Sequence, residues 1–171
     1  MLFRSQKTGF FLDQVANYAA VAAHGKGRRV LDCFSYHGGF ALAAARAGAA
    51  RVEAVEISEP AVARARRNAE LNQLSGRVEF VCANAFDVLK KYDSEKRRFD
   101  LIILDPPSFT RTKQNVNDAV RGYKEINLRA LKMLSPGGVL ATFSCSHHIH
   151  ANLFRALVVD AAADEIGRAH V

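Results

Sequence analysis

The sequence has no apolar run approaching the roughly 18 residues that a membrane-spanning helix needs. It also has no tryptophan and only three cysteines among 171 residues. An odd number of widely spaced cysteines argues against a disulfide scaffold and indicates free thiols in a reducing compartment, so we predict a cytoplasmic protein. The first 14 residues lack the apolar core and cleavage site of a targeting peptide. Internal repeats and low-complexity segments are absent from the sequence, which excludes repeat architectures.

The sequence does have an ordinary apolar content and an excess of basic residues. Hydrophobic residues make up 49%, and the length suits one domain with its own core. The net charge of +7 favours a polyanionic partner such as nucleic acid, because Lys and Arg release counterions from phosphates. A basic domain without such a partner is the alternative. The basic runs at 64–67 and 96–98 could contact RNA phosphates, but solvated faces are the simpler interpretation.

Five short runs rich in Val, Ile, Leu and Phe alternate with helical patterns. The runs are 28–34, 51–57, 77–83, 99–105 and 138–144. Several are continuously apolar, as strands buried on both faces are. The pair Pro136 and Gly137 is expected to close the helix before the fifth run. This alternation predicts a doubly wound, mostly parallel α/β sheet with right-handed crossovers, whose ligand lies at the carboxyl ends of the strands.

Three loops at these predicted strand ends carry candidate ligand-binding residues. In "LDCFSYHGGF", Gly38 and Gly39 let the backbone approach a ligand and open a helix whose free N–H groups favour an anion. The loop lacks GxGxxG, which argues against a dinucleotide. Glu56 ends the second strand, where an acidic residue commonly accepts hydrogen bonds from ribose hydroxyls; capping the next helix is the alternative. Asn84 suits either an adenine edge or a helix N-cap.

The fourth and fifth strands end in two further candidate loops. In "LDPPSF", Asp105 follows four apolar residues, so it lies at the mouth of a buried strand. Pro106 and Pro107 fix φ and remove two N–H donors, which makes the loop stiff. The fifth strand leads into "FSCSHHIH", which holds Cys145 and three histidines. A nucleophile, a set of metal ligands, and a strand end that enters a polar turn are all compatible with this stretch alone.

Taken together, these motifs resemble one family. The order "VLDCFSYHGGF", Glu56, Asn84, "DPPSF" and "FSCS" is similar to that of class I S-adenosylmethionine-dependent methyltransferases. With "KTGFFLDQ" upstream and "RGYKEIN" downstream, the chain more closely resembles the RlmI-like family of bacterial 23S (large-subunit) rRNA cytosine-C5 methyltransferases. The resemblance extends from about Lys7 to about Asp164. The combination of "FSCS" and "TGFFLDQ" is its more specific part, since "DPP" and "GG" occur singly in many relatives.

The resemblance implies S-adenosylmethionine as the cofactor, rRNA as the substrate, and a role for each matching residue. Cys145 would add to C6 of a cytosine so that C5 becomes nucleophilic, and Asp105 would hydrogen-bond the N3 edge. Pro106, Pro107 and Phe109 would contact the substrate. The implied cofactor contacts are Asp32, Phe34, Tyr36, Gly38, Gly39, Glu56, Asn84 and Asp105, together with Phe11 and Gln14 from an amino-terminal segment that folds over the cofactor. For that segment, a hairpin followed by the first turn of a packing helix is the alternative.

The chain departs from the family pattern in the cofactor loop and after the third strand. Phe34 and Tyr36 stand where the usual loop has glycines, so only Gly38 matches, at the third glycine. Asn84 stands where related chains carry Asp. Because neutral hydrogen bonds are weaker than charge-assisted ones, we expect a modestly weaker contact to the adenine amino group.

Three histidines follow the candidate nucleophile. Residues this close in sequence give poor metal geometry, and no cysteine pair has ligand spacing, so we predict no metal site. His147, His148 and His150 are interpreted instead as polar residues that begin the last helix. A protonated His147 or His148 would lower the pKa of the neighbouring thiol. The other two cysteines, Cys33 and Cys82, are predicted to be buried in strands.

Two rival functions remain compatible with the sequence. A nitrogen methyltransferase acting on adenine or guanine in nucleic acid would use the Asp-Pro-Pro loop without a thiol. A non-catalytic RNA-binding module would transfer no methyl group. Cys145 distinguishes the first rival, because only C5 chemistry requires it. Either methyltransferase needs an accessible base, flipped or single-stranded.

The resemblance also implies a catalytic-domain fragment. Enzymes of this class have seven strands and this family carries an upstream RNA-binding module, whereas this chain stops after the helix that follows the fifth strand. We therefore expect a sheet truncated before its last two strands, with weak cofactor binding and poor methylation. The expected division is a segment over the cofactor at 1–26, a methyltransferase domain at 27–164, and a non-native tail at 165–171. The oligomeric state is left open, a homodimer being one option for the full-length protein.

Overall fold

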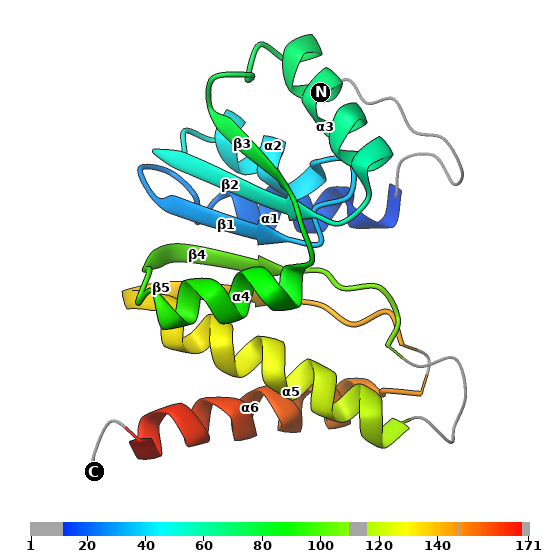
Figure 1. Ribbon diagram of the computed structural model, residues 1–171, viewed down its shortest axis with the longest axis vertical. Helices are drawn as coiled ribbons and strands as arrows, with labels where there is room; N and C mark the ends of the chain where they lie inside the picture. Colours follow the sequence, from blue (N-terminus) through cyan, green and yellow to red (C-terminus); the bar gives the residue numbers. More distant parts are fainter. Residues whose placement is uncertain (1–11, 110–115, 147, 169–171) are drawn as a thin grey trace.

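The computed structural model describes residues 12–109, 116–146 and 148–168, and in this part a five-stranded parallel sheet is covered by helices on both faces (Figure 1). The strands are β1 (Arg29–Cys33), β2 (Arg51–Glu56), β3 (Val78–Cys82), β4 (Phe99–Leu104) and β5 (Leu134–Thr142), in the order β3-β2-β1-β4-β5. The helices are the 3-10 helix η1 (Leu12–Gln14), α1 (Val15–Ala22), α2 (Gly39–Arg46), α3 (Glu59–Leu71), α4 (Ala85–Ser94), α5 (Val116–Met133) and α6 (Ala151–Arg168). The predicted doubly wound fold is confirmed.

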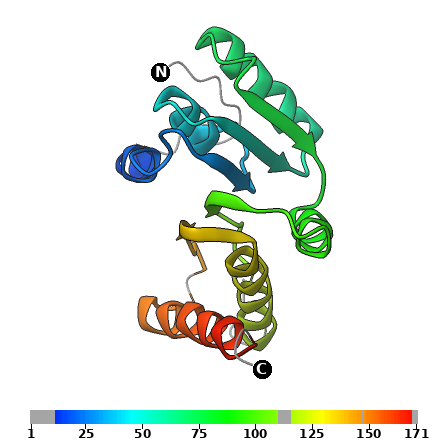
Figure 2. The same cartoon turned by 90° about the vertical axis from the view of Figure 1, so that its left-hand side faces the viewer.

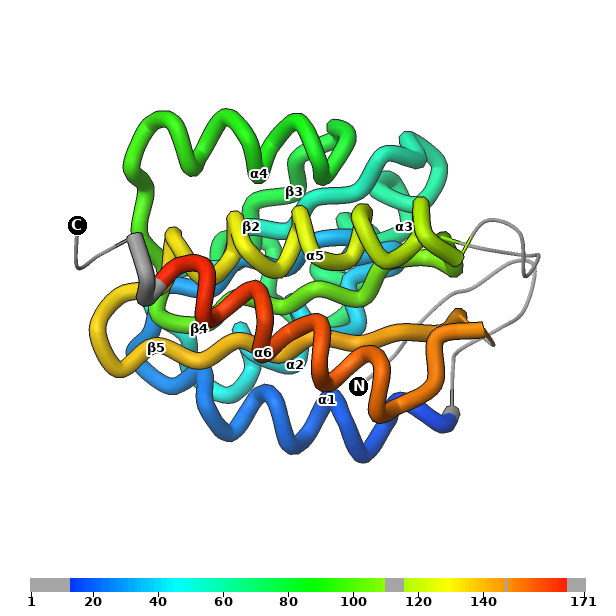
Figure 3. Tube along the Cα trace, turned by 90° about the horizontal axis from the view of Figure 1, so that it is seen from below, coloured from blue at the N-terminus to red at the C-terminus, as the bar shows by residue number. Residues whose placement is uncertain are grey.

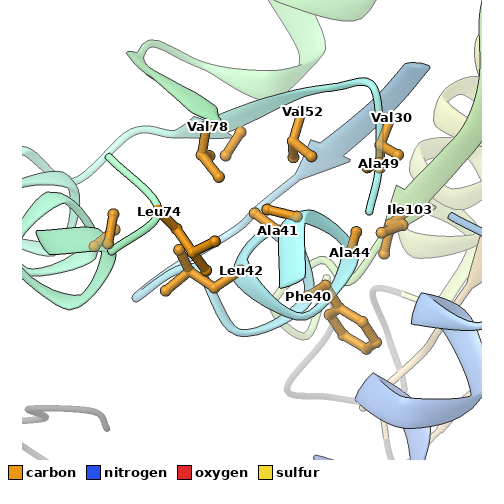
Figure 4. Packing of buried hydrophobic residues seen from close by; sticks show 14 of the residues in the cluster. Val30, Phe40, Ala41, Leu42, Ala44, Ala49, Val52, Leu74, Val78 and Ile103 are labelled. Carbon is orange, nitrogen blue, oxygen red and sulfur yellow. The ribbon is translucent and has the colours of Figure 1, made fainter. Parts of the chain in front are cut away.

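Two apolar cores lie on opposite faces of the sheet. Helices α1, α2 and α3 build the first core, and α4, α5 and α6 build the second, with α6 packed alongside α5 (Figures 2 and 3). In the first core the small side chains Ala41 and Ala44 bring α2 close to the sheet, where Val30 and Val52 are buried (Figure 4). Close-packed burial of this kind supplies most of the free energy of folding.

Burial along the strands follows their position in the sheet. The central strands β1 and β4 are buried along nearly their whole length, while the edge strand β3 alternates between buried and more exposed residues. This is the reason for the continuously apolar runs, since a strand covered by helices on both faces has no solvent-facing side. Cys82 at the end of β3 is exposed, so its predicted burial is wrong; Cys33 in central β1 is buried as predicted.

The fifth strand begins and ends earlier than predicted. Helix α5 ends at Met133 and β5 follows at once, so Pro136 and Gly137 lie inside the strand rather than at a helix end. Gly137 has φ +73° behind Pro136, the combination that a type II turn requires. The pairing of β5 with β4 is irregular at this point, and an edge strand tolerates a proline there. Because β5 ends at Thr142, Cys145 lies in the loop beyond it.

A buried ion pair connects β2 to the turn before β4. Arg97 donates to Glu53 at 2.7 Å, and the Tyr92 hydroxyl bonds the same carboxylate. The Glu53 side chain is 5% exposed and that of Arg97 is 26% exposed, with its guanidinium 3.7 Å from the centre of the Tyr92 ring. One arginine of the basic run at 96–98 is therefore part of the fold, not a solvated charge.

Replacing Arg97 should destabilise the fold. Arg97→Ala leaves the Glu53 carboxylate buried without its cation, and we expect a loss of about 2 kcal/mol, since partial exposure of the pair moderates the usual cost. Urea unfolding at pH 7 measures it. The matched control is Arg51→Ala, whose pair with Glu79 has side chains 65% and 54% exposed and should change stability by less than about 0.5 kcal/mol. Equal losses of unfolding free energy in Arg97→Ala and Arg51→Ala would contradict the structural role of the Arg97–Glu53 pair.

Both ends of the described chain are helical. Helix α1 packs on α2 through Tyr18 and Phe40, whose ring centres are 4.6 Å apart. Helix α6 runs to Arg168 and so continues past residue 164 into the segment predicted to be a non-native tail. No helix in the described part of the chain combines the length and apolarity that a bilayer crossing requires.

Candidate active site

The carboxyl ends of four adjacent strands form one edge of the sheet, and backbone hydrogen bonds hold their loops together. Strand β1 lies between β2 and β4, which is the point where the strand order reverses and where ligands of such sheets bind. Beyond the strands, Ser35 N–H donates to Val55 at 3.0 Å, and Phe143 N–H donates to Leu104 at 2.9 Å. The loops that carry the predicted residues are therefore fixed relative to one another.

The loop after β1 adopts a glycine-like backbone without the glycines. Phe34, Tyr36 and Gly38 have φ of 65°, 48° and 81°, all in the left-handed region. Phe34 and Tyr36 are the positions at which the resemblance to class I methyltransferases leads us to expect glycine, and both have a left-handed backbone although they bear aromatic side chains. Left-handed backbone at bulky residues is strained and persists only where the surroundings enforce it, as functional loops often do.

Asp32 lies under this loop, at the start of α2. One carboxylate oxygen accepts the N–H of Ala41 at 2.9 Å, so Asp32 caps the helix from the neighbouring strand. The other oxygen is buried and has no hydrogen-bond partner. Complete burial, with the nearby Asp105 carboxylate adding to it, raises the pKa of Asp32 well above its usual value. A buried oxygen without a partner is a ready acceptor for a ligand donor.

Glu56 organises the two loops on either side of it. Its two oxygens accept the N–H of Tyr36 at 3.0 Å and the N–H of Ser58 at 2.8 Å. Each carboxylate oxygen has a second lone pair, so the group retains capacity for a diol. The next residue, Ile57, is 65% exposed, and the sequence did not mark it as a candidate. A carboxylate and an exposed apolar residue thus follow each other at the end of β2.

Tyr18 of α1 is a second residue that sequence reasoning missed. Its ring covers Gly39 so closely that a Cβ there would come within 2.7 Å of it. Burial, with Asp105, Asp32 and Asp13 nearby, raises the pKa of Tyr18 to about 12. The apolar-polar pattern of α1 carried no signal for this, because the contact joins segments twenty residues apart. The amino-terminal helices η1 and α1 thus lie next to the acidic side chains of the site.

Asp105 titrates near neutral pH. Burial at the mouth of β4, with Asp13 of η1 adding a like charge, raises its pKa from 3.8 to about 6. Between pH 4 and 6 the folded state therefore holds a proton that the unfolded chain has lost. Stability falls as the pH rises through this window, because the folded state binds more protons than the unfolded state.

Replacing Asp105 by Asn should remove that dependence. Relative to the parent, Asp105→Asn should gain up to about 3 kcal/mol of stability between pH 4 and pH 7, because the cost of ionising the buried carboxyl disappears. Urea unfolding of both proteins at several pH values measures the difference. Asp118→Asn, at an exposed carboxylate paired with Arg121, is the control and should show almost no change. A difference between Asp105→Asn and parent that does not vary with pH would refute the shifted pKa.

Cys145 is exposed in the loop beyond β5 and lies against the Asp105 loop. Its thiol is 3.7 Å from the carbonyl oxygen of Pro106. Partial burial and the Asp105 charge raise the pKa of Cys145 above its usual 9.0. Burial is the larger of these two causes, and the shift in the Cys145 pKa is opposite in direction to the one predicted from a protonated His148. His147 itself lies outside the described residues.

The remaining predicted site residues have mixed surroundings. Asn84 caps α4 by accepting the N–H of Phe86 at 2.9 Å, one of its two predicted roles. Gln14 accepts from Asn17 at 2.8 Å within the amino-terminal helices. The ring of Phe109 packs among aromatic residues and lies 4.5 Å from that of Tyr123. Phe11 lies outside the described residues. In the described part of the chain, no cluster of three or more His, Cys, Asp or Glu side chains is placed to hold a metal ion.

Comparison with known proteins identifies a family to which the chain is similar. A family model described as S-adenosylmethionine-dependent methyltransferase matches residues 1–166. The chain is 47% identical over 162 residues to a ribosomal RNA large subunit methyltransferase I from Shewanella denitrificans, covering 94% of this chain and 41% of the relative. It is 45% identical over 159 residues to the protein of the same name from an Enterobacter species, covering 92% of this chain and 40% of that protein.

A solved methyltransferase structure has a similar fold. A methyltransferase crystallised in complex with SAH superposes with a TM-score of 0.80 at 27% identity, covering 94% of this chain and 43% of the other. The fold and the strand-end site thus define a class I methyltransferase architecture. The chain belongs to the family of S-adenosylmethionine-dependent methyltransferases. It spans about two fifths of the length of the curated relatives it matches.

The residues present fit the cofactor of this family. The unpartnered buried oxygen of Asp32, under the loop after β1, is placed to hydrogen-bond a bound group. The carboxylate of Glu56 and the exposed face of Ile57 suit a ribose diol and an adjacent flat ring.

Proposed function

We propose that this chain is the catalytic part of a methyltransferase that modifies C5 of a cytosine in large-subunit rRNA, with Cys145 as the nucleophile. The observation that carries the proposal is the exposed Cys145 thiol, 3.7 Å from the Pro106 carbonyl oxygen in the Asp105 loop. A methyltransferase acting on nitrogen needs no thiol at this place. The net charge of +7 suits an RNA partner, and the curated relatives are named as rRNA methyltransferases.

The first task of the residues is to hold the cofactor. Glu56 would accept hydrogen bonds from the ribose hydroxyls, Ile57 would cover one face of the adenine, and Asp32 with the loop at Gly38 would hold the amino-acid end. Asn84 would bond the adenine edge with the part of its amide that the helix cap leaves available. When bound, S-adenosylmethionine supplies a methyl group on a sulfonium, the electrophile that an activated C5 requires.

The second task is to make C5 nucleophilic. The Cys145 thiol, whose pKa is raised, gives its proton to solvent, and the thiolate then forms a carbon–sulfur bond at C6. The C5–C6 electron pair forms a C4–C5 double bond, and the C4–N3 pair moves onto N3. The Asp105 carboxyl, whose pKa of about 6 keeps part of it protonated near neutral pH, donates its proton to N3 and neutralises the developing charge. After C5 has been methylated, solvent accepts the C5 proton, the freed C–H pair re-forms the C5–C6 double bond, and the carbon–sulfur bond breaks to release the Cys145 thiolate. N3 then returns its proton to the Asp105 carboxylate.

The proposal predicts a covalent adduct with a modified RNA. Fluorine in place of the C5 hydrogen blocks the last step, so RNA carrying 5-fluorocytidine should trap the protein through Cys145 in the presence of cofactor. Mass spectrometry of the denatured, digested complex identifies the residue. If no adduct forms, and methyl transfer to ordinary RNA places the label on a base nitrogen, the protein is a nitrogen methyltransferase instead. RNA binding that is indifferent to cofactor, with no transfer and no adduct, would indicate a binding module.

A further inference from the structure

A chain of hydroxyl groups joins helix α5 to both loops that carry the proposed chemistry. The hydroxyl of Tyr123, on α5, lies 3.1 Å from Ser144 Oγ and 2.9 Å from Ser146 Oγ. Ser146 Oγ lies 3.1 Å from Ser108 Oγ, in the Asp105 loop. The two serines bonded to Tyr123 are the immediate neighbours of Cys145. The residue on either side of the thiol is thus held by one side chain.

Burial fixes the direction of these hydrogen bonds. Tyr123 is completely buried, and a buried hydroxyl proton needs an acceptor. Ser144 donates to the Tyr123 oxygen, so the Tyr123 proton goes to Ser146 Oγ. Ser146 Oγ also shares a hydrogen bond with Ser108 Oγ, in which either hydroxyl can donate. The Ser144 oxygen, whose proton is used, accepts the backbone N–H of Ser146 at 3.3 Å, which closes a small ring of bonds around Cys145.

The position of the Tyr123 hydroxyl is itself fixed by packing. The Tyr123 ring lies 4.5 Å from the ring of Phe109 and 5.4 Å from the ring of Phe154, between the Asp105 loop and α6. A ring held on two sides cannot follow a moving loop. The hydroxyl is therefore a fixed point to which the loop beyond β5 is attached.

We propose that Tyr123 is a positioning residue that aims the Cys145 thiol at the base by holding Ser144 and Ser146 and by fixing their loop to the Asp105 loop. This inference rests on the proposed function for its effect on methyl transfer. The hydrogen bonds that fix the loop beyond β5, however, do not depend on which reaction the protein catalyses. The described hydrogen bonds of the Tyr123 hydroxyl are with Ser144 and Ser146, beside Cys145, so we expect cofactor binding not to depend on this hydroxyl.

Tyr123→Phe removes the hydroxyl and keeps the ring. We expect kcat for methyl transfer to fall about 100-fold, the scale of a 1 Å misplacement of a reacting group. The KM for RNA and the Kd for cofactor should stay within about twofold of the parent, because neither surface changes. Tyr92→Phe is the matched control, since it removes another buried tyrosine hydroxyl, bonded to Glu53 away from the site, and should leave kcat unchanged.

Alkylation of the free thiols gives a second readout that needs no catalysis. With its loop released, Cys145 should react with iodoacetamide several-fold faster, while methyl transfer falls. Cys33, which is buried, should stay unreactive and reports any general unfolding. Cys82, which is exposed, should react at the same rate as in the parent, and it serves as the control for the activity of the reagent. Opposite changes in alkylation and methyl transfer are not what a loss of stability alone would produce.

A second pair of variants keeps the test decisive if Tyr123→Phe does not fold. Ser144→Ala should reproduce its effects, and Ser144→Thr, which retains a hydroxyl, should restore them. If Cys145→Ala leaves methyl transfer intact, the proposed function fails, and the alkylation rates alone then decide the role of Tyr123. Unchanged alkylation of Cys145 in both Tyr123→Phe and Ser144→Ala overturns the inference, however the methyl group is transferred.

Discussion

Cys145→Ala should lower methyl transfer to cytosine C5 by about 10³-fold or more, because without covalent addition at C6 the C5 carbon is a poor nucleophile. The cofactor affinity should remain unchanged, since the thiol contacts Pro106 and lies beyond β5, away from Glu56. Rates are measured with methyl-labelled cofactor and RNA, and the methylated nucleoside is identified by mass spectrometry. The loss should appear in kcat and leave KM nearly unaltered.

Cys82→Ala is the control for this experiment. Cys82 is also exposed, and its thiol makes a contact of the same kind, 3.7 Å from the carbonyl oxygen of Ile57. It lies at the end of β3, on the far side of β2 from the Asp105 loop. Its replacement should leave the rate within a few-fold of the parent. A rate for Cys145→Ala equal to that of Cys82→Ala would remove Cys145 from the mechanism and favour nitrogen methylation.

Glu56→Gln should weaken cofactor binding about 100-fold, or about 2.7 kcal/mol. Both carboxylate oxygens accept backbone N–H groups, from Tyr36 and from Ser58. The amide of Gln must turn its NH₂ group toward one of these donors, so one loop loses its anchor while the ribose loses a charged acceptor. Titration calorimetry with S-adenosylmethionine and with S-adenosylhomocysteine measures the change. Both ligands should be affected equally, because they share the ribose.

Glu79→Gln provides the comparison for that measurement. Glu79 lies on the neighbouring strand β3 and pairs with exposed Arg51, so its replacement removes the same charge without touching either loop. Its cofactor affinity should match that of the parent. A change of less than about threefold in Glu56→Gln would mean that the carboxylate serves only to connect the loops and that the cofactor is held elsewhere.

The strained loop after β1 explains how this chain can depart from the family's glycines. Phe34 and Tyr36 keep the left-handed backbone that glycine adopts without cost. Contacts from other segments hold them there: the Tyr36 N–H is bound by Glu56, and the Phe34 ring packs near those of Phe86 and Phe109. Phe34 and Tyr36 thus differ from glycine in side chain but have the backbone conformation that glycine favours.

The sequence by itself determined the alternation of strands and helices and the order of the candidate residues along it. Continuous apolar runs identify strands buried on both faces, and Glu56 and Asp105 stand at the ends of two of them. These features depend on near neighbours in the chain, which a linear pattern records. The fold class and the edge of the sheet where a ligand binds follow from them.

Tertiary structure alone decided the local chemistry. The pKa of Cys145 rises because packing partly buries the thiol and brings the Asp105 carboxylate close to it, whereas the adjacent histidines suggested the opposite direction. Tyr18 packs over Gly39, and Tyr123 bonds the two serines beside Cys145. Each contact joins segments about twenty residues apart. Desolvation, charge proximity and shared hydrogen bonds are properties of the packed molecule, so no reading of adjacent residues supplies them.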